Sequence, residues 1–195
     1  MRPRRSVLLL LAAAVTACAT LQQLAALRDV DFAVDRVSGA RLAGVELDRI
    51  RSYADLSAAD AGRLALAVTQ RDLPLEFTLH LSALNPEDNS VDARLVRMDW
   101  TLLLQDRETL SGTLAEETVL PRGVPTDVPI PIRLDLVEFF DGSARDLVDL
   151  ALDLVGRGGE DPSEVALRAT PVVESPLGPI RYPQPITIVS REIGG

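Results

Sequence analysis

Lysine is absent from this chain of 195 residues, so all 20 basic residues are arginines, a composition that fits either a genome of high GC content or a salt-rich habitat. Cysteine and histidine occur once each, as Cys18 and His80. A lone cysteine excludes an intramolecular disulfide, and one cysteine with one histidine excludes a zinc site of the usual thiolate–imidazole kind. Acidic residues outnumber basic ones by 29 to 20, which makes binding to nucleic acid or polyphosphate unfavourable.

No apolar run in the sequence is long enough to cross a bilayer as a helix. The N-terminal run, Val7–Val15, has nine residues, whereas a spanning helix needs about 20. Three arginines, Arg2, Arg4 and Arg5, precede this run. A basic start followed by a short apolar run is typical of a secretory signal peptide, so we predict that residues 1–17 are removed.

The end of the apolar run, Val15-Thr16-Ala17-Cys18, resembles the lipobox of bacterial lipoproteins. The resemblance implies that signal peptidase recognises Val15, Thr16 and Ala17 and cuts before Cys18, which is then acylated on its thiol and its new amino group. Several acyl chains hold a protein firmly at a membrane, whereas one chain binds only marginally. The alternative is an ordinary signal peptide followed by an incidental cysteine.

Removal of the leader leaves 178 residues (195 − 17) with a formal charge of −12 (17 basic − 29 acidic). Residues 18–28 then form the lipidated cysteine and a short tether, and residues 29–195 form one domain of ordinary size. In many Gram-negative lipoproteins, a residue other than Asp after the cysteine directs the protein to the outer membrane. Ala19 therefore favours the outer membrane, with the domain facing the periplasm.

Beyond the tether, apolar and polar residues alternate with the period of two that half-buried strands require. Two segments have helical spacing instead, one opening at Ser57 and one at Ser143, and the second ends at Gly156. Many short strands with turn signals between them predict a mainly β protein, a β-sandwich with one or two accessory helices. Strands are expected around residues 30–34, 45–47, 73–81, 96–104, 128–136, 165–169 and 186–188, and a further strand is expected to end at Leu120. Turns are expected at Ser38-Gly39, after the first strand, and at 106–108, before the strand that ends at Leu120.

One of these strands carries two prolines of the same parity, Pro129 and Pro131, while Val128, Ile130 and Ile132 share the opposite face. Proline cannot donate to a ladder and is tolerated only where one side of the strand has no partner. The pattern therefore predicts an edge strand that is protected against edge-to-edge association.

The order of motifs resembles the late embryogenesis abundant type 2 family, also called water stress and hypersensitive response (WHy) domains. The motifs are an alternating strand that ends in Asn85-Pro86, the Leu120–Gly123 turn, the strand "VPIPIRLDL", a helix and "SPLGPIRYPQP", together spanning roughly residues 29–190. The resemblance implies an immunoglobulin/fibronectin-III-like sandwich, a role in protection during water, salt or cold stress, and neither catalytic residues nor a cofactor. Glu87 stands where many members have Asn, which predicts a different turn geometry.

Few residues are candidates for chemistry. His80 shares the polar face of its strand, so a solvated surface position is expected. A Ser-His-Asp hydrolase would have to use this histidine, but the sequence has no G-x-S-x-G elbow to carry the serine. "NPEDNSVD" (85–92) could offer oxygen ligands to calcium but lacks EF-hand spacing, which favours an exposed turn. Glu116 and Glu117 are expected to be neighbours on a strand and so to point to opposite faces, which prevents them from flanking one substrate bond. Trp100 is expected in the core. The sequence thus predicts no catalytic residue, metal site, cofactor or small-molecule substrate.

The most concrete expectation is a non-enzymatic, lipid-anchored envelope protein that protects protein clients under water, salt or desiccation stress through an acidic, hydrated surface. The alternative is an interaction module whose anchor tethers an envelope complex. An exposed apolar patch on a sheet would favour the interaction module, and a pocket with buried carboxylates would favour an enzyme instead.

Overall fold

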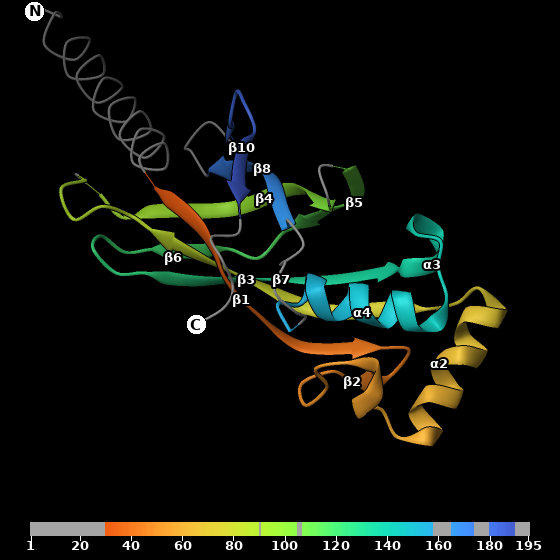
Figure 1. The fold of residues 1–195 in the computed structure, drawn as a ribbon. Helices are drawn as coiled ribbons and strands as arrows, with labels where there is room; N and C mark the ends of the chain where they lie inside the picture. The colour runs from red at the N-terminus through yellow and green to blue at the C-terminus, as the bar shows by residue number, and fades with distance from the viewer. Residues whose placement is uncertain (1–29, 90, 105–106, 158–164, 174–179, 190–195) are drawn as a thin grey trace, which may run out of the picture.

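Two antiparallel sheets form the protein, which we describe from a computed structural model covering residues 30–89, 91–104, 107–157, 165–173 and 180–189. One sheet has four strands in the order β2-β1-β3-β7, and the other has the order β10-β8-β4-β5, with β6 beside β4 and β9 beside β8. Apolar side chains from both sheets belong to one continuous core. The sheets lie as two layers in Figure 1, so the expected β-sandwich is confirmed.

The four-stranded sheet is built around β3 (Pro74–Leu84), whose inward side chains alternate strictly with half-buried outward ones. The flanking strands are β1 (Asp31–Leu42) and β7 (Thr126–Asp135), and β2 (Val45–Glu46) pairs only with the end of β1. β7 is the edge strand, as predicted, and Pro129 and Pro131 are exposed on it opposite His80 and Thr78.

The six-stranded sheet has β4 (Ala93–Leu104) at its centre. β8 (Val165–Val173) lies on one side of β4, and β5 (Arg107–Leu114) and β6 (Thr118–Leu120) share the other side. β9 (Ile180–Arg181) and β10 (Ile186–Val189) pair with β8. Trp100, on β4, is buried as expected.

Helices gather at one end of the sandwich, at the right of Figure 1. They are η1 (Tyr53–Asp55), α2 (Ala58–Gln70), α3 (Leu136–Phe139) and α4 (Ala144–Leu154). Ser57 caps α2, and Ser143 with Asp146 forms the capping box of α4. Both predicted helices are therefore confirmed, and the apolar face of α4 closes this end of the core with its side chains Leu147, Val148, Ala151, Leu152 and Leu154.

The structure corrects the sequence analysis at several places. Ser38-Gly39 is not a turn: β1 continues through it, and a register shift between Ser38 and Arg41 marks a bulge in which Gly39 has φ +63°. The expected strand ending at Leu120 is two strands, β5 and β6. Glu116 and Glu117 lie in the exposed link between them, so the argument from strand neighbours does not apply. Leu136 begins α3 rather than ending a strand.

Candidate functional site

The predicted leader and anchor, with Val15, Thr16, Ala17 and Cys18, lie outside the described residues, as does residue 106 of the expected turn at 106–108. The other two residues of that turn, Arg107 and Glu108, belong to β5 instead. The domain that follows the tether begins in the structure at Val30, which is buried, and β1 starts at the next residue. Within the described ranges, no helix is long and apolar enough to span a membrane.

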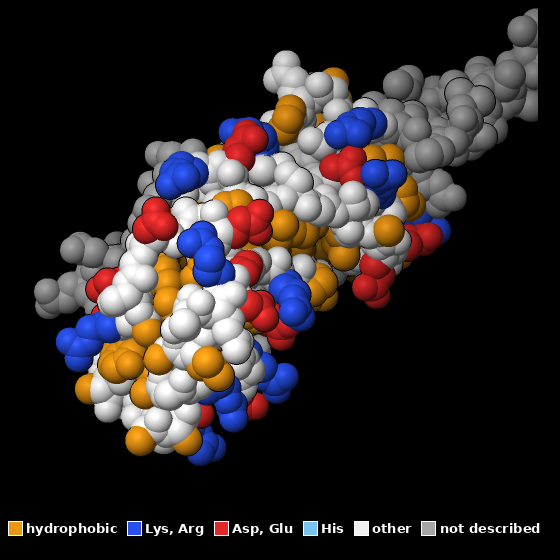
Figure 2. Space-filling view, turned by 90° about the vertical axis from the view of Figure 1, so that its right-hand side faces the viewer, with side chains coloured by type: hydrophobic (Ala, Val, Ile, Leu, Met, Phe, Trp, Pro, Cys, Tyr) orange, Lys and Arg blue, Asp and Glu red, His pale blue; other side chains and the backbone are white. Residues whose placement is uncertain are grey.

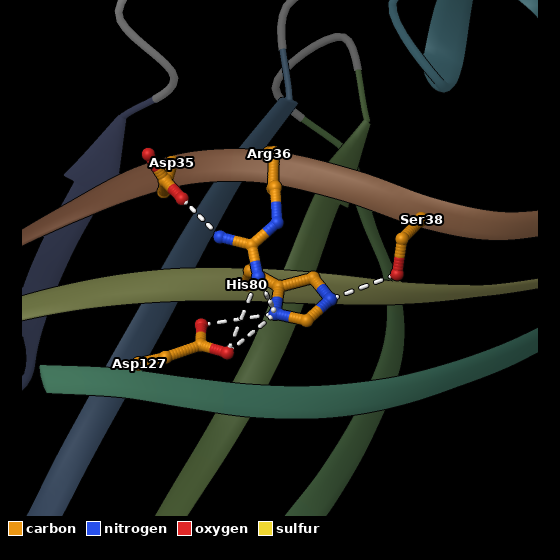
Figure 3. A network of polar contacts seen from close by, with 5 residues as sticks. All are labelled: Asp35, Arg36, Ser38, His80 and Asp127. Carbon is orange, nitrogen blue, oxygen red and sulfur yellow. Dashed lines mark hydrogen bonds and ion pairs between the residues drawn. The ribbon is translucent and has the colours of Figure 1, made fainter.

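A cluster of polar side chains lies on the outer face of the four-stranded sheet, across β1, β3 and β7 (Figure 3). We call it the His80 cluster; its members are Asp35, Arg36, Ser38, His80 and Asp127. Arg36 stands directly opposite His80 in the β1–β3 ladder, and Asp127 lies diagonally across on β7, opposite Ser82. Side chains in these positions are close enough to interact on one face of a sheet.

His80 is hydrogen-bonded through both ring nitrogens. Nδ1 lies 2.9 Å from each carboxylate oxygen of Asp127, and Nε2 lies 2.8 Å from Oγ of Ser38. The side chain is only 12% exposed, so the expectation of a solvated histidine is wrong. The neighbouring strands explain the difference, because Arg36 on β1 and Asp127 on β7 both reach Nδ1 of the ring, and neither partner is near His80 in sequence.

The contacts of Nδ1 fix the arrangement of protons. Nη2 of Arg36 also lies 3.1 Å from Nδ1, but a guanidinium can only donate, and Nδ1 cannot accept from it while donating to Asp127. We assign the proton to Nδ1, where it faces two acceptor oxygens, and let Arg36 donate to Asp127 at 3.4 Å and to Asp35. Nε2 then accepts from the Ser38 hydroxyl, and every member of the cluster has a partner.

This order of groups, hydroxyl to imidazole to carboxylate, is that of a nucleophilic triad. Such a triad also needs a water-excluded site with donors aimed at the developing oxyanion. The side chains of Arg36, Asp35 and Asp127 are 52%, 47% and 46% exposed, so water reaches the cluster freely. The arrangement therefore fits a cross-link between three strands better than it fits catalysis.

Asn85, predicted as part of the turn motif, has a second and different role. It is fully buried, the one buried polar or charged side chain among the described residues. Its Nδ2 donates to the carbonyls of Leu120 at 2.9 Å and Val91 at 3.2 Å, and its Oδ1 accepts from Asn89. Its own carbonyl accepts from the amide of Gly123 at 2.7 Å. Asn85 thus joins β3, the loop 86–92 and the end of β6.

The residues around Asn85 form the expected turn. Pro86 is half-buried and begins the loop, and its carbonyl accepts from the amide of Asn89. Glu87 does not need the left-handed conformation, since the described non-glycine residues with positive φ are Ala43 and Arg71. Asp92 faces the amide and guanidinium of Arg122, so its carboxylate holds an arginine. No group of three or more His, Cys, Asp or Glu in the described ranges could hold a metal ion.

One carboxylate on the six-stranded sheet has a perturbed pKa. Partial burial raises the pKa of Asp99, but hydrogen bonds from Thr113 and Arg97 and the charges of Arg97 and Arg181 outweigh burial and lower it below the usual value. The Asp99 oxygens lie 2.8 Å from Thr113 Oγ1 and 3.0 Å from Arg181 Nη1. Asp99 thus links β4, β5 and β9 as His80 links the strands of the other sheet.

Comparison with known proteins leaves the chain without an assigned family. No protein-family model matches it, and no curated protein matches it significantly. Among solved structures, a candidate late embryogenesis abundant (LEA) protein is 14% identical, with 97% of this chain and 87% of that one covered and a TM-score of 0.37. A protein from Archaeoglobus fulgidus is 11% identical (60% and 86% covered, TM-score 0.32).

A candidate ApaA protein from Bordetella pertussis is a third similar structure, at 12% identity, with 83% of this chain and 94% of that one covered and a TM-score of 0.33. Scores at this level do not assign the chain to the family of any of the three proteins. The fold defines the class of protein, a β-sandwich with helices at one end.

Proposed function

We propose that the chain is a lipid-anchored, non-enzymatic protein of the bacterial envelope that protects other proteins as water is lost. The lipobox-like segment ending at Cys18, and Ala19 after it, support an anchor in the outer membrane facing the periplasm. The resemblance of the motif order to the late embryogenesis abundant type 2 family supports the protective role.

The observation that supports the proposal is that the charged side chains lie at the protein surface. Asn85 is the one polar or charged side chain that is buried in the described residues, so the described carboxylates and guanidiniums are all at least partly exposed. Viewed from the helical end, acidic and basic side chains are interspersed over the surface rather than gathered by sign (Figure 2). With a mature charge of −12, such a surface binds water and repels its copies, which separates clients during drying.

A drying assay tests the protective role directly. The mature chain with Cys18→Ser, which cannot be acylated on a thiol, is dried with a fragile reporter enzyme, and the recovered activity is scored. We expect recovery above that given by equal masses of albumin and of an unrelated acidic protein. Recovery no better than these controls would contradict the protective role and direct the search to a crosslinked envelope partner.

A matched variant isolates the contribution of charge. Asp88, Glu116, Asp141 and Asp149 are exposed. Changing all four to their amides lowers the negative charge by four with little change in shape. We expect the variant to unfold at nearly the same denaturant concentration as the parent and to protect less well. Equal protection by the variant would show that charge is not the cause.

A further inference from the structure

Large apolar side chains are seldom exposed in the part of the chain that the structure describes, and the exposed ones are not evenly spread. Among the described residues, four large apolar side chains are exposed: Leu66 (56%), Leu84 (37%), Val119 (47%) and Val124 (53%). Leu66 lies on α2 at the helical end. The other three lie at the opposite end of the sandwich, toward the left of Figure 1, where β3 ends and β6 leads into β7.

The contacts of Asn85 bring these three side chains to one end. Leu84 precedes Asn85, and Val124 follows Gly123, whose amide donates to the Asn85 carbonyl. Val119 precedes Leu120, whose carbonyl accepts from Asn85 Nδ2. We call this end, with Leu84, Val119 and Val124, the apolar tip. Buried Asn85 thus holds the backbone of these segments together at this end of the sandwich.

The apolar tip is also the end at which the chain arrives from its N-terminus. Asp31, the first residue of β1, pairs with Leu84. Cys18 lies twelve residues before Val30, and twelve residues span at most about 43 Å when fully extended. β3 has eleven residues and is therefore about 36 Å long, and α2 leads into its far end. The apolar tip can therefore lie at the lipid without extension of the tether, whereas Leu66 can approach the lipid only if the tether runs the length of the domain.

We propose that the apolar tip rests against the lipid surface and orients the domain with α2 and α4 pointing away from it; the proposal rests on the lipid anchor proposed above. Exposed Leu and Val side chains gain by leaving water at a bilayer interface. Glu87 and Asp88 are exposed at the same end and repel anionic headgroups. The surface that fits the tip is therefore one in which zwitterionic lipid predominates.

Lipidation of the native cysteine allows a fluorophore to be attached at one chosen position. A chain lipidated at Cys18 has no free thiol, so a cysteine introduced elsewhere is the one site for a thiol-reactive fluorophore. The full-length gene is expressed with its leader in a Gram-negative host, and the mature protein is reconstituted into phosphatidylethanolamine vesicles. Val124→Cys reports on the apolar tip, and Leu66→Cys, an equally exposed apolar position at the far end, is the control.

Fluorescence quenching by a headgroup-labelled nitroxide lipid measures proximity to the bilayer. We expect the probe at position 124 to be quenched at least twofold more than the probe at position 66, and adding anionic lipid at low salt to reduce that difference. Equal quenching at both positions, or stronger quenching at position 66, would overturn the orientation. Both variants should unfold at the parent's denaturant midpoint.

Thiol reactivity of the parent protein distinguishes a failure of the orientation from a failure of the lipid anchor on which the orientation rests. If the parent has no reactive thiol but the probes of the two variants are quenched equally, the orientation is overturned and the anchor is not. One reactive thiol in the parent, at Cys18, would overturn the anchor itself and with it the basis for the orientation.

Discussion

The indole ring of Trp100 lies over Gly112, its antiparallel partner on β5, so closely that a Cβ added to Gly112 would stand 2.3 Å from Cζ2 of the ring. Trp100 is 7% exposed, which means that the missing side chain of Gly112 makes room for the largest side chain of the core. The glycine is required here by close approach and not by a turn.

Gly112→Ala should therefore destabilise the protein by about 1–3 kcal/mol, the usual cost of overpacking a core. Trp100→Leu should remove most of that penalty in a double-mutant cycle, because the two residues are in contact. Urea unfolding followed by circular dichroism measures both. Gly62→Ala is the control: an added Cβ meets nothing within 4 Å on α2, so the change should be neutral or slightly stabilising.

Asn85→Ala should cost about 2–4 kcal/mol, because it leaves the buried carbonyl of Leu120 and the partly buried carbonyl of Val91 without this donor. Local opening of the loop 86–92 should follow, seen as faster amide exchange there. Asn89→Ala, which removes the half-buried donor to Asn85 Oδ1 but keeps the bonds from Asn85 Nδ2, is the milder comparison. A fully stable Asn85→Ala protein would show that the turn holds without its buried amide.

Replacing Pro129 and Pro131 together by threonine should promote association, because the outer edge of β7 regains two N–H donors. Light scattering over a range of concentrations detects the change. Pro125→Thr, in the exposed turn before β7, should leave the protein unassociated. No increase in mass for the double variant would mean that the prolines are not what protects this edge.

The His80 cluster should behave as a structural cross-link. Ser38→Ala and Asp127→Asn should each lower the free energy of unfolding by about 0.5–1.5 kcal/mol, the usual worth of a hydrogen bond. A serine-directed fluorophosphonate should not label the protein. Labelling that Ser38→Ala abolishes would contradict the non-enzymatic proposal and make the cluster a catalytic triad.

Acid should destabilise the fold through three carboxylates. The pKa of Asp55 is lowered by backbone amides of Arg51 and Ser52, that of Asp146 by the Ser143 hydroxyl and amide, and that of Asp99 as described above. Because the folded-state pKa is below the unfolded value of 3.8, their stabilisation is complete above that pH and is lost as pH falls through the folded values. Urea midpoints at pH 7, 4 and 3 measure this loss, and Asp99→Asn should reduce it.

Local patterns predicted what is local. The capping box at Ser143 and Asp146, the same-parity prolines of β7 and the alternation of β3 each contain their own signal within a dozen residues. The Ser38-Gly39 prediction failed because a bulge and a turn share the same residue types, and only pairing with β3 distinguishes them. The partners of His80 lie 42 and 47 residues away, so no local pattern could bring Ser38 and Asp127 to it.

The intact mass of the protein extracted from the membrane fraction of a Gram-negative host tests the lipid anchor most directly. A lipid anchor at Cys18 predicts a chain that begins at Cys18 and carries the added mass of acyl groups, with no reactive thiol. A chain that begins elsewhere, or begins at Cys18 with a free thiol, would contradict the lipid anchor and the orientation built on it.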